Sequence, residues 1–276
     1  MTEQTKTSLK RKLIRWIKVI ALLYGLVGIL IYYLQGYIMF HPEKISSDTP
    51  WQFNVPFKEI NIPFSNTDTI NVVQFLADTN HRKGVVIYFH GNKENIGRYA
   101  KFANNFTKHG YEVWMEDYPG FGKSVGERSE RILNQQAIQL YRLALTKYHA
   151  DSIILYGKSL GTGIASYVAA VSNAKRLILE TPYYNAPAIF SCYAPFYPME
   201  RMIKYKLPTN EYLPEVKYPI TIFHGTSDWV IPYRCASRLK AVLKPTDEFI
   251  TIEDGNHNNL NDYPLFHTKL DSVLKL

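Results

Sequence analysis

A serine flanked by glycines, between an apolar run and a run of small residues, is the feature that most constrains the fold. The apolar run 153–156 favours a β-strand and stops at Gly157. Gly161 follows Ser159 closely, and the residues after it form a pattern typical of a helix. So sharp a turn strains its central residue, and the two glycines let the chain fold back beside it. The sequence therefore predicts a strand, a tight turn and a helix, with the Ser159 hydroxyl above the end of a sheet.

The pentapeptide G-K-S-L-G at residues 157–161 matches the G-x-S-x-G nucleophile elbow, which lies between a strand and a helix. Five residues alone are a weak signal, because a structural glycine-rich turn can have the same sequence. The strand and helix patterns on either side favour the nucleophile interpretation. Ser159 is therefore the candidate nucleophile, and Gly157 and Gly161 are the candidate elbow glycines.

A serine hydroxyl is a poor nucleophile at neutral pH, so it needs a nearby base and a third group that orients the base. Asp228 follows the predicted strand 220–224, and His257 follows the predicted strand 248–253. Loops after the carboxyl ends of parallel strands share one edge of the sheet, so both side chains can meet Ser159. The sequence predicts a triad of Ser159, Asp228 and His257, in the chain order expected after such an elbow.

Other acids and bases are weaker candidates. Glu180 ends a predicted strand and is the second choice for the acid, whereas Asp254 is too close in sequence to His257 to orient it well. His224 ends a strand ahead of its loop, which favours a structural role. We expect surface positions for five histidines: His41, His81, His109, His149 and His267.

The negative oxygen of a tetrahedral intermediate needs preorganised hydrogen-bond donors. We expect the backbone N–H of Leu160, the residue after the candidate nucleophile, to be one donor. The second is expected in the loop after the strand 84–89, where Gly91 allows a close approach and Asn92 offers its N–H. Because both donors are backbone groups, side-chain changes at Leu160 and Asn92 are expected to act through loop shape.

Strand and helix patterns alternate along the chain, which favours an α/β fold with a mainly parallel, doubly wound sheet. The first two strands, joined by a turn at 65–68, are expected to pair antiparallel at one edge. The predicted strands are 58–64, 70–76, 84–89, 111–116, 153–156, 176–180, 220–224 and 248–253. The predicted helices are a stretch ending near 109, then 129–148 with Ser129 as its N-cap, the segment after the elbow, 232–243 and 259–274.

The segment 184–218 interrupts this alternation between strands and helices. It holds five prolines and many aromatic residues, so it cannot form one long helix. One interpretation is a small cap insertion whose aromatic lining meets an apolar substrate. The alternative is a surface excursion packed by its own side chains. We favour the cap for the segment as a whole.

Residues 19–40 are a run of 22 residues without a charged side chain. A helix of that length spans the hydrocarbon core of a bilayer, which is about 30 Å thick. Residues 1–18 carry six basic side chains and one acidic side chain, so the positive-inside rule predicts a cytoplasmic N-terminus. Aromatic residues lie near both ends of the run, as in many membrane spans. The sequence predicts an uncleaved, single-pass transmembrane helix at 19–40 and a catalytic domain, 41–276, on the non-cytoplasmic side.

Two alternatives to an uncleaved membrane anchor explain the run less well. A cleaved signal peptide has a short apolar core and small residues before the cleavage site, whereas this run is long and ends in bulky side chains. A helix that packs only on its own domain needs a polar face, which this run lacks.

Charge, cysteine content and motif spacing argue against several other functions. The net charge is +8, but residues 1–18 contribute +5 and leave +3, so nucleic acid is not an expected partner. Cys192 and Cys235 form no metal-ligand cluster, and we expect free, partly buried thiols rather than a pair formed in an oxidising compartment. The Gly-Lys-Ser sequences at 122–124 and 157–159 lack the glycine that a phosphate-binding loop has five residues earlier.

Five segments match a known pattern as a set, and they extend over the whole predicted catalytic domain. They are FHGN at 89–92 with NIG at 95–97, DYPGFGKSVG at 117–126, GKSLGTG at 157–163, HGTSDWVIP at 224–232 and GNHNNL at 255–260. Together they resemble the α/β-hydrolase superfamily, and within it the membrane-anchored serine hydrolases of the Bem46, ABHD13 and ABHD17 types.

The resemblance implies the α/β-hydrolase fold, the same triad, and Asn92 with Leu160 as oxyanion donors. Two departures from the family pattern, Lys93-Glu94 and Pro119, bear on substrate choice. For that reason the protein depalmitoylase activity of some relatives is not carried over to this chain.

The sequence as a whole predicts a membrane-tethered serine hydrolase that cleaves carboxylic esters or thioesters through an acyl-enzyme, with water as co-reactant and no metal or other cofactor. The aromatic segment favours a small-molecule or lipid-like substrate with an apolar acyl group. A peptidase or an acyltransferase on the same residues is the first alternative. A membrane-tethered binding protein without chemistry is the second.

Overall fold

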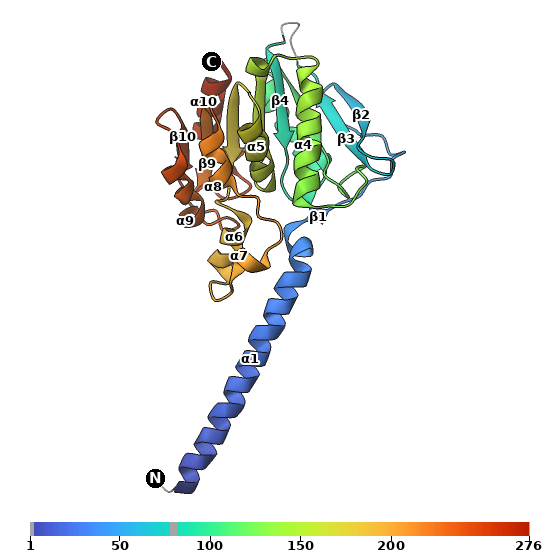
Figure 1. The fold of residues 1–276 in the computed structure, drawn as a ribbon. Helices are drawn as coiled ribbons and strands as arrows, with labels where there is room; N and C mark the ends of the chain where they lie inside the picture. Colours follow the sequence, from blue (N-terminus) through green and yellow to red (C-terminus); the bar gives the residue numbers. More distant parts are fainter. Residues whose placement is uncertain (1–2, 78–81, 276) are drawn as a thin grey trace.

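Eight strands form the main sheet of the computed structural model, which describes residues 3–77 and 82–275 (Figure 1). The order across the sheet is β10-β9-β8-β7-β4-β6-β3-β2, and every neighbouring pair is parallel except β2 with β3 and β3 with β6. The strands are β2 Phe57–Pro63, β3 Thr69–Phe75, β4 Gly84–Phe89, β6 Tyr111–Glu116, β7 Ile153–Lys158, β8 Arg176–Glu180, β9 Ile220–Gly225 and β10 Glu248–Ile252. The predicted mainly parallel sheet and its antiparallel first pair are confirmed.

Helices cover both faces of the sheet. α4 Glu130–Leu145 and α5 Leu160–Val171 pack on one face, and α2 Ile96–Tyr99, α3 Asn104–Thr107 and α10 Pro264–Lys275 pack on the other. β4 and β7 lie between these layers and are buried along their whole length. Burial on both faces explains why their sequences are continuous apolar runs.

Several predicted helices are shorter or broken. The stretch ending near 109 is divided into α2, a 3₁₀ turn Ala100–Phe102, and α3. Asn104, Asn105 and Thr107 have weak helix propensity, and the chain forms only single turns there. The predicted helix 232–243 is α9 Tyr233–Ala236 followed by a 3₁₀ turn Ser237–Val242, and a 3₁₀ turn Leu260–Asp262 precedes α10. Ser129 does cap α4, because its side chain accepts a hydrogen bond from the Ile132 N–H at 3.2 Å.

The segment 184–218 forms a cap below the sheet, beside the end of the long N-terminal helix (Figure 1). It contains α6 Ala186–Tyr193, α7 Met199–Met202, α8 Thr209–Tyr212 and a 3₁₀ turn Leu213–Glu215. Pro187 and Pro214 lie in the first turns of α6 and the 3₁₀ turn, Pro198 and Pro208 are the N-caps of α7 and α8, and Pro195 follows the end of α6. The prediction that proline divides this segment is therefore confirmed.

A disulfide joins Cys192 in α6 to Cys235 in α9, so the expectation of free thiols is wrong. The two Cα atoms are 7.1 Å apart although the residues are separated by 43 positions. Only the folding of the cap against α9 brings them together, and sequence spacing could not reveal that. The bond attaches the cap to the main domain.

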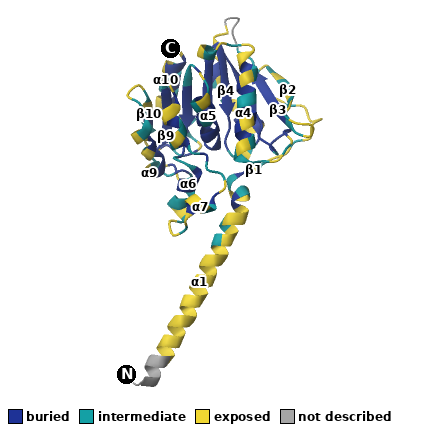
Figure 2. Cartoon of the chain, viewed as in Figure 1, coloured by how far each residue is buried: buried dark blue, intermediate teal, exposed yellow. Residues whose placement is uncertain are grey.

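The helix α1 Glu3–Met39 projects from the domain, and most of its surface is exposed (Figures 1 and 2). From Ser8 to Met39 it is long and apolar enough to cross a membrane. It begins earlier than the predicted span 19–40, because the Lys and Arg residues before the span favour a helix. Its end enters the domain, where Gln35 and Phe40 are buried, and β1 His41–Pro42 then pairs with β5 Lys93–Glu94.

Candidate active site

Ser159 occupies the turn between β7 and α5 alone. Its φ of 50° and ψ of −117° lie in a region that residues other than glycine rarely adopt. The Ser159 N–H donates to the Glu180 carbonyl of β8 at 2.9 Å, which holds the turn in place. A Cβ atom on Gly157 would lie 2.6 Å from the Gly161 carbonyl oxygen, and one on Gly161 would lie 2.0 Å from the Phe89 carbonyl oxygen. Neither glycine position therefore has space for a side chain.

The structure brings Ser159, His257 and Asp228 together at the carboxyl edge of the sheet. His257 Nε2 lies 2.9 Å from Ser159 Oγ, and His257 Nδ1 lies 2.8 Å from Asp228 Oδ2. The N–H groups of Val230 and Ile231 donate to Asp228 Oδ1 at 2.9 and 2.8 Å. A carboxylate held in this way accepts the Nδ1–H of the imidazole and leaves Nε2 free to accept the serine proton.

His224 lies beneath this arrangement and has a structural role. Its Nε2–H donates to the Ile231 carbonyl at 2.9 Å, and the same nitrogen is 3.6 Å from Asp228 Oδ2. Burial lowers the pKa of His224 below its usual range, although Asp228 opposes that shift. The imidazole therefore stays neutral at physiological pH and supports the loop that carries Asp228.

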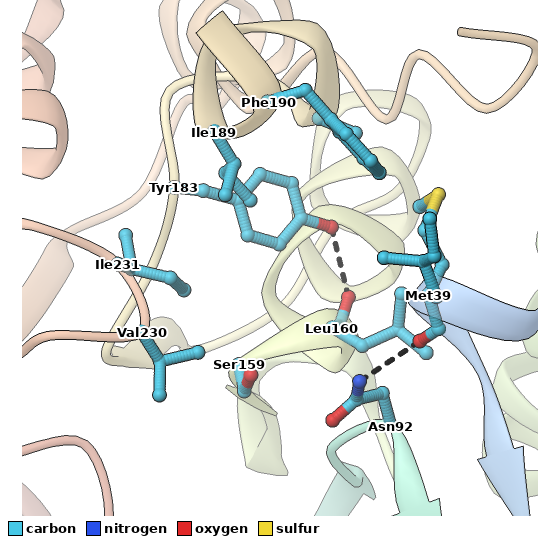
Figure 3. A pocket seen from close by; sticks show the side chains of 11 residues that line it. Met39, Asn92, Ser159, Leu160, Tyr183, Ile189, Phe190, Val230 and Ile231 are labelled. Atoms are coloured by element: carbon cyan, nitrogen blue, oxygen red, sulfur yellow. Dashed lines mark hydrogen bonds between the residues drawn. The ribbon is translucent and has the colours of Figure 1, made fainter. Parts of the chain in front are cut away.

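Asn92 and Leu160 line the cavity beside Ser159, and Figure 3 shows them close to each other. Within the described residues, neither backbone N–H has a hydrogen-bond acceptor, so both are available to a ligand. The Asn92 side chain donates from Nδ2 to the Met39 carbonyl at 2.9 Å, and the His41 N–H donates to the Asn92 carbonyl at 2.8 Å. The end of α1 therefore holds the loop of Asn92, a contact that sequence reasoning missed.

A buried polar pair, also missed, supports the same loop. His90 and Asp117 are inaccessible to solvent, and His90 Nε2 lies 3.3 Å from Asp117 Oδ1. On its other edge, His90 Nδ1–H donates to the Gly91 carbonyl at 2.7 Å, next to Asn92. Burial raises the pKa of Asp117, although His90 opposes the shift. The conspicuous FHGN and DYPGFG segments were the available signal for this pair.

The rejected candidates lie elsewhere. Glu180 is buried under the turn and bonded to Lys158 Nζ and Tyr156 OH. Asp254 is exposed, with its N–H bonded to Thr226 Oγ1 at 2.9 Å. Of the histidines expected at the surface, His41 and His149 are exposed, whereas His109 and His267 are half-buried and hydrogen-bonded, and His81 lies outside the described residues.

A cavity of about 120 Å³ adjoins Ser159, and its walls come from five separate parts of the chain. Figure 3 shows Met39 and Phe190 on one side and Ile189, Val230 and Ile231 on the other. Apart from Ser159, Asn92 and Tyr183, the described residues that line it are apolar, and none is charged. The Tyr183 hydroxyl donates to the Leu160 carbonyl at 2.9 Å, away from the serine. The space beside Ser159 Oγ therefore suits an apolar group.

The described residues contain no group of three or more His, Cys, Asp or Glu side chains that could hold a metal ion. The acidic and imidazole groups around Ser159 are instead engaged with one another and with backbone N–H groups.

Comparisons with known proteins agree with this architecture. A family model described as serine aminopeptidase, S33, matches residues 80–210. Protein ABHD12B of Homo sapiens is 26% identical over 181 residues, which cover 58% of this chain and 50% of that protein. The α/β-hydrolase domain-containing protein aho-3 of Caenorhabditis elegans is 24% identical over 202 residues, which cover 69% of this chain and 57% of that protein. The chain thus spans only about half of these relatives.

Solved structures show the same fold. The Pyrococcus furiosus esterase Pf2001 superposes with a TM-score of 0.65 at 17% identity, covering 87% of this chain and 98% of the esterase. Acetyl xylan esterase 1 from Thermoanaerobacterium gives a TM-score of 0.62 at 16% identity, covering 80% of this chain and 87% of that enzyme. With the sheet order and the serine turn described above, these similarities define an α/β-hydrolase fold. The family model, the relatives and these structures together support membership of the α/β-hydrolase superfamily.

Proposed function

We propose that the protein is a membrane-anchored serine hydrolase that cleaves carboxylic ester or thioester bonds through an acyl-enzyme intermediate. One observation carries the proposal: His257 lies within hydrogen-bond distance of both Ser159 Oγ, at 2.9 Å, and Asp228 Oδ2, at 2.8 Å. A neutral imidazole between a hydroxyl and a buried carboxylate is the arrangement that makes serine nucleophilic.

Acylation begins when Ser159 Oγ attacks the substrate carbonyl carbon and its proton passes to His257 Nε2. The imidazolium that forms is stabilised by Asp228, whose other oxygen is fixed by two backbone N–H groups. The carbonyl oxygen becomes negative and accepts hydrogen bonds from the N–H groups of Leu160 and Asn92. Loss of one such donor costs roughly 10²- to 10³-fold in rate.

Acylation ends when His257 Nε2–H gives its proton to the leaving alcohol or thiol as the bond to the acyl carbon breaks. In deacylation a water molecule attacks the acyl-enzyme, with the same imidazole as base, and the carboxylic acid leaves as Ser159 Oγ regains its proton. Apart from the substrate, the reaction needs only the protein and one water molecule.

The cavity favours an apolar acyl group over an amino-terminal peptide. An aminopeptidase must hold a charged α-amino group, and the described residues lining the cavity offer it no carboxylate. Because the matching family model carries an aminopeptidase name, a peptidase or acyltransferase on the same residues is the alternative. Faster hydrolysis of p-nitrophenyl acyl esters than of aminoacyl anilides is the expected result, and the reverse would favour the peptidase.

The proposed anchor is the segment 19–40, which lies in α1 up to Met39, between a cytoplasmic tail, 1–18, and a catalytic domain, 41–276. The exposed apolar surface of α1 and the basic residues before it support this topology. The Cys192–Cys235 disulfide is a second support, because such bonds persist on the oxidising, non-cytoplasmic side of a membrane. Release of the protein into the soluble fraction by carbonate washing would contradict an anchor.

Labelling with a fluorophosphonate probe tests the proposal. The full chain should be labelled, and Ser159→Ala should lose both the label and turnover, by on the order of 10⁶. Ser166→Ala is the matched control, because Ser166 is a buried serine of α5 whose hydroxyl makes no hydrogen bond within the described residues. A label that persists in Ser159→Ala would disprove the assignment, and a wild-type chain that takes no label would favour the binding protein.

A further inference from the structure

Phe196 and Tyr197, at the tip of the cap, pack against the middle of α1. The rings of Tyr24 and Tyr197 stack with centroids 4.4 Å apart and an angle of 3° between their planes. The Tyr24 hydroxyl donates to the Phe196 carbonyl at 2.8 Å, and the Tyr197 hydroxyl donates to the Tyr24 carbonyl at 2.9 Å. Gly28 leaves room for this contact, since a Cβ there would lie 3.1 Å from the Tyr197 ring.

A second contact fastens the cap nearer the domain. The buried side chain of Gln35 donates to the Met202 carbonyl at 3.2 Å and accepts from the Lys204 N–H at 2.5 Å. Lys204 Nζ lies 4.7 Å from the centre of the Tyr32 ring. Tyr24 and Gln35 are eleven residues apart, or about 16 Å along a helix. The cap therefore lies alongside α1 over a length comparable to half of a hydrocarbon core.

The distribution of charged residues in the cap also changes along α1, between the level of Tyr24 and the level of Gln35. Residues 181–199 contain no charged side chain, and their tip, 193–198, is the part that meets Tyr24. The charged side chains of the cap begin at Glu200, at the level that contacts Gln35. Tyr193 and Phe196 at the tip are 60% and 85% exposed. The uncharged tip of the cap thus lies against the uncharged run 19–40 of the N-terminal segment.

Much of the backbone of the tip is satisfied within the protein. Pro195 and Pro198 have no N–H to satisfy, the Tyr197 N–H donates to the Ala194 carbonyl at 3.3 Å, and the Met199 N–H donates to the Tyr197 carbonyl at 2.8 Å. The Phe196 carbonyl accepts from the Tyr24 hydroxyl, as described above. A loop enters hydrocarbon only where its polar groups are satisfied within the protein.

The same side chains connect the tip to the serine cavity. Met39 and Phe190 line the cavity, and both also pack on the cap cluster formed by Ala186, Met199 and Ile203. Figure 3 shows the two side chains close together at one side of the cavity. The cap and α1 therefore form one continuous apolar wall from the tip to the surroundings of Ser159.

We propose that the cap tip, residues 193–198, inserts into the leaflet of the bilayer on the domain side of α1, and that an acyl ester carried by a membrane lipid reaches Ser159 from that leaflet. The second half of this inference rests on the proposed function, and the first half does not. The occupant of the tip surface is phospholipid hydrocarbon, because the surface is uncharged and continuous with the apolar surface of α1.

Spin labelling tests the insertion directly. Phe196→Cys carries a nitroxide in the full chain, reconstituted in phosphatidylcholine nanodiscs without reductant, and the native cysteines are already bonded to each other. Val171→Cys is the control, because Val171 is 58% exposed and ends α5 at the side away from Ser159. We expect the label at 196 to collide with oxygen and not with a water-soluble nickel chelate, and the label at 171 to do the reverse. Equal chelate access at both sites would overturn the proposal.

Kinetics test the route of the substrate. Phe196→Asp should lower hydrolysis of a long-chain ester in phosphatidylcholine vesicles about tenfold, since a carboxylate in the leaflet is costly. Hydrolysis of soluble p-nitrophenyl acetate and fluorophosphonate labelling should be unchanged, as should all three readouts in Val171→Asp. An unchanged vesicle rate, or equal loss on both esters, would overturn the route. If the wild-type chain cleaves neither ester, the proposed function is wrong. The spin-label measurement would still show whether the tip inserts into the membrane.

Discussion

The sheet edge around Ser159 and the cap, 184–218, face each other across one cavity, yet they are built in opposite ways. At the sheet edge Ser159, Asp228 and His257 are buried, and the backbone is so close that Gly157 and Gly161 cannot carry a side chain. The cap consists of short helices separated by prolines, and it is half-exposed. The disulfide and the contacts with α1 hold it in place.

The difference follows from what each region has to do in the proposed mechanism. Proton transfer and charge stabilisation depend on atoms held to a fraction of an ångström, so they require a rigid, buried setting. Admission of an acyl chain requires only an apolar wall of the right shape, which adaptable packing can supply. Changes at the sheet edge should therefore affect kcat, and changes in the cap should affect stability and access.

The largest expected effect comes from Asp228→Asn. The amide can still accept from the Val230 and Ile231 N–H groups, but its NH₂ then faces His257 Nδ1 and favours the tautomer with its proton on Nε2. That tautomer cannot accept the serine proton, so we expect kcat to fall on the order of 10⁴, or about 5.5 kcal/mol. Asp254→Asn, an exposed acid at a φ of 56°, is the control and should retain activity in the same esterase assay. A loss below tenfold in Asp228→Asn would show that Asp228 does not orient the base.

The next largest effect concerns the attachment of the cap. Replacing Cys192 and Cys235 together by Ala removes a cross-link across 43 residues, which should lower the free energy of unfolding by about 3 kcal/mol. Thermal unfolding of the full chain measures this loss, and fluorophosphonate labelling of Ser159 below the transition should continue. Reductant should reproduce the shift in the wild type and cause none in the double variant. A large loss of labelling in the folded double variant would contradict this expectation, because it would mean that the sheet edge around Ser159 needs the attached cap in order to react.

These two regions also differ in how far the sequence predicts them. The strands 84–89, 111–116 and 176–180 coincide with β4, β6 and β8, because strands buried on both faces are uninterrupted apolar runs with clear ends. Ser159 was selected from the elbow pattern and Asp228 and His257 from the ends of strands, and the topology of a parallel sheet carries such loops to one edge. Local pattern and topology were sufficient there.

The cap and its neighbours depend on contacts that local pattern does not contain. The stacking of Tyr24 on Tyr197 and the disulfide join residues far apart in sequence, and each requires the final packing of short helices. Met39 was assigned to a membrane span, yet its carbonyl binds Asn92 and its side chain lines the cavity. The helix 232–243 was also predicted too long, because apolar periodicity does not distinguish an α-helix from a 3₁₀ turn.

A smaller effect is expected from Glu116, a buried acid at the end of β6, because its burial makes the stability of the protein depend on pH. Burial, with Asp117 beside it, raises the pKa of Glu116 to about 8, from 4.5. Between those pH values the unfolded chain releases a proton that the native chain keeps, so stability falls as pH rises through this window. Glu116→Gln cannot ionise, so its free energy of unfolding should change less from pH 5 to 8.

At pH 8 the Glu116→Gln variant should be more stable than the wild type by on the order of 2 kcal/mol, less than the full pKa shift implies because a buried amide also lacks partners. Urea unfolding at several pH values measures the difference. The exposed Glu211→Gln is the control and should leave the pH dependence as it is. Parallel pH curves for wild type and Glu116→Gln would show that Glu116 is not held protonated.

The smallest effect lies where the two regions meet, at the end of α1. Asn92→Ala keeps the backbone N–H that we assign to the oxyanion but removes the hydrogen bond from Nδ2 to the Met39 carbonyl. One lost hydrogen bond of about 1 kcal/mol loosens the loop, so kcat on a soluble ester should fall several-fold to tenfold with little change in KM. Asn105→Ala removes a comparable bond, to Asn261 Oδ1 at 2.7 Å, on the other face of the sheet and should leave kcat unchanged. If Asn92→Ala behaves like Asn105→Ala, α1 serves as a wall and an anchor without positioning the reacting groups.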